Sequence, residues 1–274
     1  VIRPKPVTRS IASARWRSVE DLSLVLPLLA GGDGIDPKTA SVPLSDDRDT
    51  QVARLRIAYH DDNGIYTPTS DVRAVVDDVV ATLTDRGATL KAAIPPEIGE
   101  AIEIGQGVSR VGWGHDLAAD DAYIRHPDVT VANLRGDIDR GVAAARNLKS
   151  EDAQLGIEFY FLMWKLDLYR SRMLSWMQDF DALVCPAMGY PAQPHGFSQD
   201  AAFSHLGYVG YTHPYSLLGW PSLVVRAGTA ENGMPVGIQV IARPWREDVA
   251  LALGAAIETD LGGWTSPDLN RISS

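Results

Sequence analysis

The chain has 274 residues, of which 45% are hydrophobic and 22% charged, a composition typical of a globular protein with one large domain or two small ones. Its 25 Lys and Arg residues against 35 Asp and Glu residues give a net charge of −10, which argues against nucleic acid as a partner. No apolar run approaches the ~18 residues that a transmembrane helix needs, so we expect no membrane partner. The single cysteine excludes an internal disulfide and favours a cytoplasmic protein.

Residues 1–16 contain prolines and basic residues but no apolar run, so we interpret them as coil rather than as a signal peptide. A helix is predicted to begin after Ser18, which has the capping spacing to Asp21. It should bend at Pro27 and end at the Gly-Gly pair that follows. We interpret residues 32–52 as loop. The apolar face of this helix consists of Val19, Leu22, Leu26 and Leu29.

A strand, a helix and a second strand are predicted next. The strands cover residues 55–59 and 88–92, and the helix begins near Ser70 and stops at Gly87. Such a unit needs two parallel strands joined by a right-handed crossover, which predicts an α/β fold. The buried face of the helix consists of Val72, Val75, Val76, Val79 and Leu83.

The pattern is less clear between residues 95 and 147, where we expect helices around 98–111 and 131–147. Gly105 and Gly107 have the spacing that opens a dinucleotide-binding motif. However, Arg110 stands where the motif needs glycine, and no strand precedes it, so we predict no nucleotide cofactor.

A long helix is predicted to start at Ser150 and to lead into a short buried strand at 182–185. Apolar residues recur along one face of this helix. We interpret that face as packed in the core rather than as an interface or coiled coil, because no charge pairing lies beside it. The face consists of Leu155, Phe159, Leu162, Leu166, Tyr169, Met173, Trp176 and Phe180.

A β-hairpin is predicted near the C-terminus. Its strands cover residues 222–227 and 236–241, and Asn232-Gly233 between them is a dipeptide that commonly closes hairpins. A last helix should start at Asp248, and we interpret residues 264–274 as coil. We assign residues 1–274 to a single domain.

The sequence contains no recognisable short motif for a metal site or for a catalytic nucleophile. No HExxH pattern and no close histidine pair supports a metal site, and no GxSxG elbow supports an α/β-hydrolase. We interpret Cys185 as a small buried apolar residue. We interpret each histidine as a surface or loop residue: His60, His115, His126, His195, His205 and His213.

Four blocks together resemble the amidase-signature family of Ser–cis-Ser–Lys hydrolases. They are RSVEDL at 17–22, DALVCP at 181–186, the YT, P and LLGWP elements of 211–221, and GMPVGIQVIARPWREDVALALGAAIE at 233–258. The resemblance implies an α/β fold with a mixed twisted sheet flanked by helices. It also implies hydrolysis of linear carboxamides to a carboxylic acid plus ammonia or amine, with no metal and no organic cofactor.

The family's lysine and Gly/Ser-rich nucleophile run, of the GGSSGG type, lie upstream of the RSVEDL-like block. Only residues 1–16 precede that block here, and the one Ser-Ser pair is at 273–274, without glycines. We therefore expect the C-terminal portion of an amidase fold, lacking the N-terminal catalytic part and inactive by itself, so that we assign no catalytic residue. The alternative is a non-catalytic binding or assembly protein with an amidase-like fold.

The resemblance also implies a set of substrate-binding residues, for which core packing is the alternative. Ser216 stands in the family's usual Asn place, and Val209 replaces the Asp of relatives that draw ammonia from glutamine, which argues against a tRNA amidotransferase. The bulky side chains favour an aromatic or apolar acyl group in a small-molecule amide, and a homo-oligomer remains open. The set is Tyr211, Thr212, Tyr215, Ser216 and Trp220.

Overall fold

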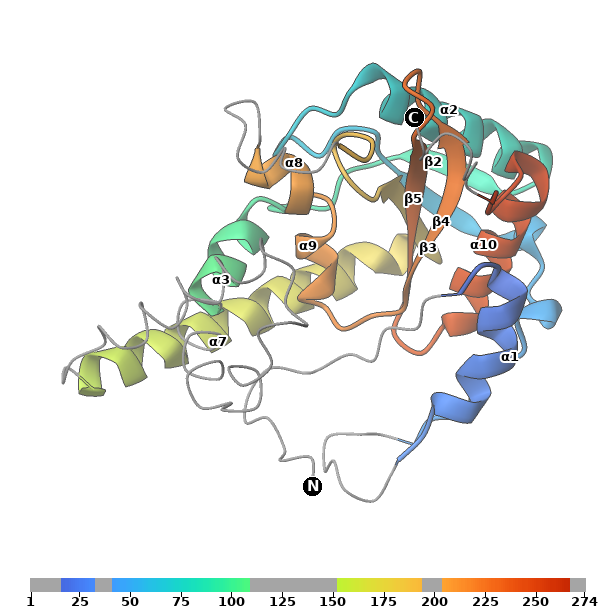
Figure 1. Ribbon diagram of the computed structural model, residues 1–274. Helices are drawn as coiled ribbons and strands as arrows, with labels where there is room; N and C mark the ends of the chain where they lie inside the picture. Colours follow the sequence, from blue (N-terminus) through green and yellow to red (C-terminus); the bar gives the residue numbers. More distant parts are fainter. Residues whose placement is uncertain (1–15, 33–40, 109–151, 194–203, 267–274) are drawn as a thin grey trace, which may run out of the picture.

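The computed structural model describes residues 16–32, 41–108, 152–193 and 204–266, and it places one mixed sheet between helices (Figure 1). The strands are β1 (Arg56–Tyr59), β2 (Thr89–Ala92), β3 (Ala182–Pro186), β4 (Ser222–Thr229) and β5 (Pro235–Ala242). The helices are α1 (Val19–Leu29), α2 (Ser70–Asp85), α3 (Glu100–Val108), α7 (Asp152–Trp176), α8 (His205–Val209), α9 (His213–Ser216) and α10 (Glu247–Leu261). Short 3₁₀ turns lie at Asp47–Asp49, Val52–Arg54 and Met177–Asp179.

The sheet has five strands in the order β2-β1-β3-β5-β4. Strand β1 runs parallel to β2 and β3, whereas β5 runs antiparallel to both β3 and β4. Ile57 pairs with Ala182, and Val225 pairs with Ile238, so the parallel unit and the hairpin share one sheet. The predicted α/β class, with a mixed sheet flanked by helices, is confirmed.

The hairpin turn forms where the sequence predicts it. Gly233 has a φ of +80°, a conformation that suits glycine because it has no Cβ. The side-chain oxygen of Asn232 accepts a hydrogen bond of 3.0 Å from the N–H of Met234. This local chemistry closes the connection between β4 and β5.

Helices α2 and α10 cover one face of the sheet, and α1 lies against α10 (Figure 1). All five predicted apolar residues of α2 are buried, which confirms the face. Ser18 caps α1 as predicted, since its hydroxyl oxygen accepts a hydrogen bond of 3.1 Å from the N–H of Asp21. The prediction for Leu29 is wrong: it is 60% exposed, because the packed face of α1 ends with Leu26.

Helices α7, α3 and α9 cover the opposite face. Along α7, Leu166, Tyr169 and Met173 are buried and Leu162 is partly buried, which confirms a core-packing face. Other positions of α7, among them Tyr160 and Trp164, are more than half exposed. The predicted cap at Ser150, the helix at 131–147 and nearly all of the two terminal coils lie outside the described residues.

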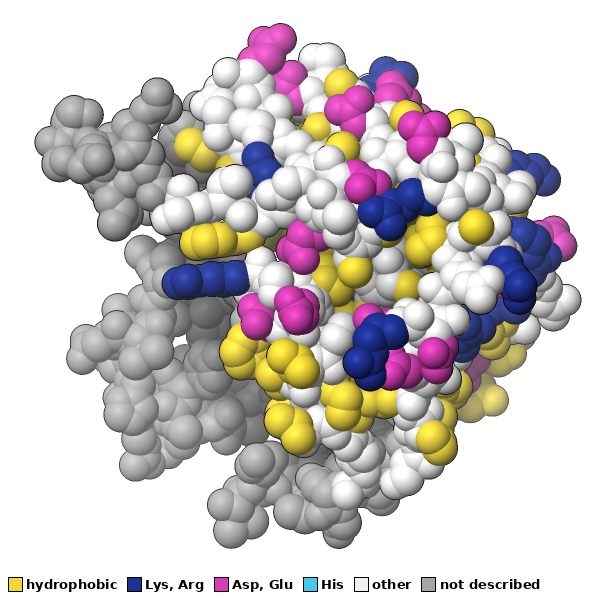
Figure 2. All heavy atoms as spheres, turned by 90° about the vertical axis from the view of Figure 1, so that its right-hand side faces the viewer, with side chains coloured by type: hydrophobic (Ala, Val, Ile, Leu, Met, Phe, Trp, Pro, Cys, Tyr) yellow, Lys and Arg dark blue, Asp and Glu magenta, His cyan; other side chains and the backbone are white. Residues whose placement is uncertain are grey.

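Within the described ranges, no helix is long and apolar enough to cross a membrane. Figure 2 looks onto the side of the molecule that carries α1 and α10, and it shows acidic and basic side chains interspersed above a gathering of hydrophobic ones. The outer side of α1 contributes exposed leucines, Leu24 at 68% and Leu28 at 82%.

A buried leucine of α2 and an exposed leucine of α1 allow a matched test of how much packing contributes to stability. Leu83→Ala removes a fully buried side chain and should lower the free energy of unfolding by about 2–5 kcal/mol, because it leaves a cavity in the core. Leu28→Ala makes the same chemical change at an exposed site and should shift it by about 0.5 kcal/mol or less. Urea unfolding of both variants measures the difference, and equal losses would contradict the packing described.

Candidate functional site

The candidate site lies at the carboxyl ends of β1 and β3. In open α/β sheets, ligands bind outside the carboxyl ends of parallel strands where neighbouring connections diverge. The chain leaves β1 toward β2 on one side, while β3 lies on the other, so this point is such a divergence. His60 directly follows β1, and its N–H donates a hydrogen bond of 3.2 Å to the C=O of Val184 in β3.

His60 and Tyr215 form a buried polar pair. Nε2 of His60 lies 2.8 Å from the hydroxyl of Tyr215, and the two residues are 4% and 1% exposed. Burial lowers the pKa of His60 to about 4, so the imidazole is neutral near pH 7. His60 lies just after β1, so its interpretation as a surface or loop residue holds for its place in the chain. Its side chain is nevertheless buried, because it packs beneath α9.

A sequence signal for His60 exists in the strand alternation. Side chains two residues apart on a strand share a face, so His60 continues the row of Ala58, which the predicted strand could have placed toward the core. Sequence analysis ended the predicted strand at residue 59 and made no prediction of burial for His60. Only the packing of α9 over this row decides the burial.

Cys185 lies beneath the same tyrosine. It is fully buried, and burial raises the pKa of its thiol well above the usual range, although a hydrogen bond with Tyr215 acts in the opposite direction. The thiol therefore stays protonated at neutral pH, and a thiolate nucleophile is unfavourable here. The interpretation of Cys185 as a small buried residue is confirmed.

Tyr211 and Tyr169 anchor the segment that carries α9. Tyr211 is fully buried, and its hydroxyl donates a hydrogen bond of 2.7 Å to the C=O of Tyr66. The hydroxyl of Tyr169 in α7 donates to the C=O of Pro214 at 3.1 Å. Burial raises the pKa of both hydroxyls, so they act as hydrogen-bond donors and not as bases.

The other residues proposed from the sequence are distributed around this core. Thr212 is half-buried, and its C=O accepts hydrogen bonds from the N–H groups of Tyr215 and Ser216. Ser216 is exposed, and its hydroxyl donates to the C=O of His213 at 2.9 Å. Trp220 is 8% exposed and packs in the same apolar cluster as Tyr215. The structure thus joins Tyr211 and Tyr215 around His60, and it places Ser216 on the outer side.

A second buried polar side chain continues this row across the sheet. Gln239 in β5 is the register partner of Cys185 and is 2% exposed. Its Oε1 and the Nδ1 of His60 are buried without a hydrogen-bond partner within the described ranges. An unsatisfied buried group costs about 1–3 kcal/mol, so such atoms mark places where a further group would be stabilising.

Gly105 has a packing role that sequence analysis missed. A Cβ at this position of α3 would lie 1.5 Å from Nε2 of His213, so only glycine lets α3 approach α9 this closely. The incomplete dinucleotide motif around Gly105 therefore has a structural explanation. Burial also lowers the pKa of His213.

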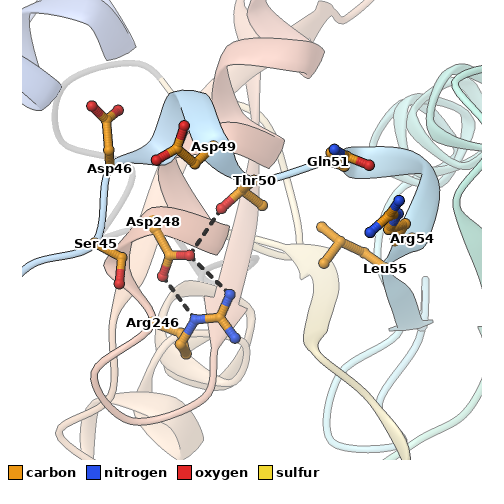
Figure 3. A pocket seen from close by; sticks show the side chains of 9 residues that line it. All are labelled: Ser45, Asp46, Asp49, Thr50, Gln51, Arg54, Leu55, Arg246 and Asp248. Carbon is orange, nitrogen blue, oxygen red and sulfur yellow. Dashed lines mark hydrogen bonds and ion pairs between the residues drawn. The ribbon is translucent and has the colours of Figure 1, made fainter.

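A separate pocket of about 490 Å³ lies where α10 begins (Figure 3). Asp248 is 4% exposed and accepts hydrogen bonds of 2.8 Å from Nε and Nη2 of Arg246 and of 2.9 Å from Thr50. Burial opposes ionisation of Asp248, but these donors hold its pKa below the usual range. The groups satisfy one another and tie α10 to the segment 46–54, so we interpret this pocket as structural.

The described part of the chain contains no group of three or more His, Cys, Asp or Glu side chains that could hold a metal ion. A second groove, of about 600 Å³, lies between α1, α10 and residues 44–48. Its lining mixes apolar residues, such as Val19 and Leu251, with acidic ones, such as Glu247 and Glu258, and none of the residues proposed from the sequence lines it.

Comparison with known proteins gives a family match over most of the chain. A family model described as Amidase matches residues 6–251. The chain is 26% identical over 266 residues to an acylamidase of Rhodococcus erythropolis, covering 92% of this chain and 51% of that protein. It is 27% identical over 259 residues to a glutamyl-tRNA(Gln) amidotransferase subunit of Acidobacterium capsulatum, covering 88% and 54%.

Solved structures share the fold. A structure of 6-aminohexanoate cyclic dimer hydrolase complexed with substrate superposes with a TM-score of 0.76 at 21% identity, covering 92% of this chain and 55% of that one. A bacterial aryl acylamidase of the amidase-signature enzymes superposes with a TM-score of 0.68 at 20% identity, covering 89% and 51%. The chain thus spans about half the length of these relatives.

The buried histidine makes stability depend on pH. The unfolded chain binds more protons than the folded one between about pH 4 and 6.5, so stability that is present above this window is lost as the pH falls through it. His60→Gln keeps a polar partner for Tyr215 but does not titrate, and it should remove about 3 kcal/mol of this pH dependence. Urea unfolding across the window measures both proteins, and parallel pH profiles would contradict the burial of a neutral His60.

The two paired aspartates of α10 give a matched comparison of buried and exposed ion pairs. Asp248→Asn should lower the free energy of unfolding by about 2–3 kcal/mol, because it weakens hydrogen bonds to a nearly buried carboxylate. Asp260→Asn removes the charge from an equally bidentate but exposed pair with Arg86, and it should leave the midpoint nearly unchanged. Denaturation of both variants measures this contrast, and a larger loss for Asp260→Asn would reverse our interpretation.

Proposed function

The chain belongs to the amidase family, and we propose that it forms the substrate-side portion of a hydrolase of linear carboxamides, which yields a carboxylic acid plus ammonia or amine. The main support is the family match over residues 6–251 in a chain whose sheet places a buried polar site beneath the YT-containing segment. The acylamidase among its relatives is named for action on amides, and another relative is named as a hydrolase of the 6-aminohexanoate cyclic dimer.

We propose that the 274-residue chain is inactive by itself and corresponds to the C-terminal portion of the amidase fold. Its sequence contains no Gly-Ser-Ser-Gly run, and its single thiol, at Cys185, is buried and protonated. The lysine and the serine nucleophile would belong to the half of the fold that the relatives have and this chain does not align with. Loss of a nucleophile typically lowers kcat by about 10⁶-fold.

The proposed substrate-binding residues would have two kinds of role. Thr212 and Ser216 are not fully buried and carry hydroxyls that could contact a polar part of the substrate. Tyr211, Tyr215 and Trp220 are buried and would shape an apolar wall suited to an aromatic or apolar acyl group. In the completed enzyme, an acyl-enzyme would form on serine with backbone N–H groups holding the oxyanion, and no metal or organic cofactor is needed for that chemistry.

The proposed organisation is that of a single-domain protein that binds a small molecule. Residues 1–274 would form one domain, with coil at 1–16 and 264–274. The partner would be a small-molecule amide, with no role for nucleic acid, and the protein would be cytoplasmic, consistent with its single cysteine. Association of identical chains remains compatible with this organisation.

A non-catalytic binding or assembly protein with an amidase-like fold is the second candidate. The exposed side of α7 favours it, because large apolar side chains recur there at helical spacing: Ile157, Tyr160, Phe161 and Trp164 are each 53–68% exposed. Aromatic side chains of this kind are enriched in protein interfaces.

Active-site labelling tests the proposed inactivity. The isolated chain, treated with a fluorophosphonate and digested, should show no labelled serine in the mass spectrum and should not hydrolyse simple aryl or alkyl amides, because the nucleophile run is absent. The acylamidase of Rhodococcus erythropolis, a relative of this chain, serves as the positive control for amide hydrolysis. A labelled serine in the isolated chain would refute the proposal.

A further inference from the structure

Helix α1 has two apolar sides, of which the described structure covers one. Val19, Leu22 and Leu26 belong to the side that packs into the core. Leu24 and Leu28 are 68% and 82% exposed, and because they are four residues apart they lie together on a second side of the helix. A helix that is apolar on most sides is normally buried. The second side of α1 therefore has the composition of a contact surface.

The groove of about 600 Å³ between α1, α10 and residues 44–48 adjoins this exposed side, because Leu24 also lines the groove. Its volume falls within the range of about 300–1,000 Å³ that is usual for ligand-binding cavities. Figure 2, which looks onto this side of the molecule, shows hydrophobic side chains gathered together. The groove and the exposed leucines thus form one apolar surface. All three segments contribute apolar residues to the lining, among them Val19, Leu26, Leu44, Leu251 and Ala255.

The charges around the groove are mostly negative. Arg48 is the one basic residue among those that line it, and its guanidinium pairs with Asp46. Neither Glu20 nor Glu247 forms an ion pair with another residue of the described ranges. Lysine or arginine side chains of an occupant would therefore find carboxylates of complementary charge. The carboxylates that line the groove are those of Glu20, Asp46, Asp47, Glu247 and Glu258.

Two hydrogen bonds fix the walls of the groove. The carboxylate of Glu258 in α10 accepts a hydrogen bond of 2.9 Å from the N–H of Val19, at the start of α1. The carboxylate of Asp47 accepts one of 3.2 Å from the hydroxyl of Ser23, one turn further along α1. These bonds connect α1 both to α10 and to the segment 44–48. The groove is therefore formed without an occupant, which lowers the entropy that binding costs.

We propose that the groove and the adjoining leucines dock a basic amphipathic helix of a partner protein, with its apolar side chains in the groove and its lysines or arginines beside the carboxylates. A helix of about three turns covers both the groove and Leu28, whereas a small cationic molecule in the groove leaves Leu28 exposed. The net charge of −10 disfavours a second copy of this chain and an anionic membrane surface as occupants. The groove lies on the face of the sheet opposite to α9, so this proposal goes beyond amide hydrolysis and does not depend on it.

Fluorescence anisotropy tests the groove with the 274-residue chain and a labelled peptide of leucines and lysines arranged at helical spacing. The peptide should bind to one saturable site, gain helix by circular dichroism, and bind more weakly as the salt concentration rises. A peptide of the same composition in shuffled order has the same charge but no apolar face, and it should bind about tenfold more weakly or worse. Equal binding of both peptides would overturn the proposal, because charge alone would then explain the affinity. Sedimentation showing that the chain dimerises, and that Leu24→Ser abolishes the dimer, would overturn it as well.

Exposed leucines provide a first set of matched variants. Leu24→Ser and Leu28→Ser should each weaken binding of the helical peptide about tenfold, because each removes apolar surface that the contact buries. Leu174→Ser makes the same change at a 47% exposed leucine of α7, on the other face of the sheet, and should leave the affinity unchanged. A loss in Leu24→Ser without one in Leu28→Ser would contradict a docked helix, since the occupant would then reach only the groove.

Exposed carboxylates provide a second set. Glu20→Gln combined with Glu247→Gln should weaken binding about three- to tenfold, because two complementary charges beside the peptide are lost. Asp77→Asn combined with Asp78→Asn changes the net charge by the same amount on the exposed side of α2, away from the groove, and should leave the affinity unchanged. Equal losses in the two double variants would contradict docking at the groove, because the peptide would then respond to the overall charge of the chain.

Discussion

The central strand β3 is completely buried, and this burial governs how the neighbouring strands must pair. All five residues from Ala182 to Pro186 are buried, because α2 and α10 cover one face and α7 and α9 the other. Their backbone groups must therefore be satisfied within the sheet, by β1 on one side and β5 on the other. This requirement joins the parallel unit to the antiparallel hairpin in a single sheet.

The carboxylate just before β3 contacts arginines at the ends of both flanking strands. Asp181 accepts a hydrogen bond of 2.9 Å from the N–H of Arg56, at the start of β1. Its carboxylate also lies 3.2 Å from the guanidinium of Arg56 and 3.4 Å from that of Arg243, at the end of β5. One carboxylate thus connects β1, β3 and β5 at the end of the sheet opposite to His60.

Burial also determines the protonation states at the other end of the sheet, near His60. His60, Cys185 and Tyr215 are all titratable, and desolvation shifts the pKa of each in the direction that favours its neutral form near pH 7. A neutral, hydrogen-bonded cluster can orient α9 and the hydroxyls beside it, but it offers no ionised nucleophile.

Elements with local sequence signals could be predicted before the fold was known. Strand alternation, the five apolar residues of α2, the cap at Ser18 and the Asn232-Gly233 turn each depend on neighbours a few residues apart, so they could be read directly. The family resemblance added the mixed sheet. Three features emerge only from the packed fold: His60 is buried under Tyr215, the missing side chain of Gly105 makes room for His213, and Leu29 faces outward. These features depend on contacts between segments more than 100 residues apart, or on where a packed face stops, and hydrophobic periodicity carries neither kind of information.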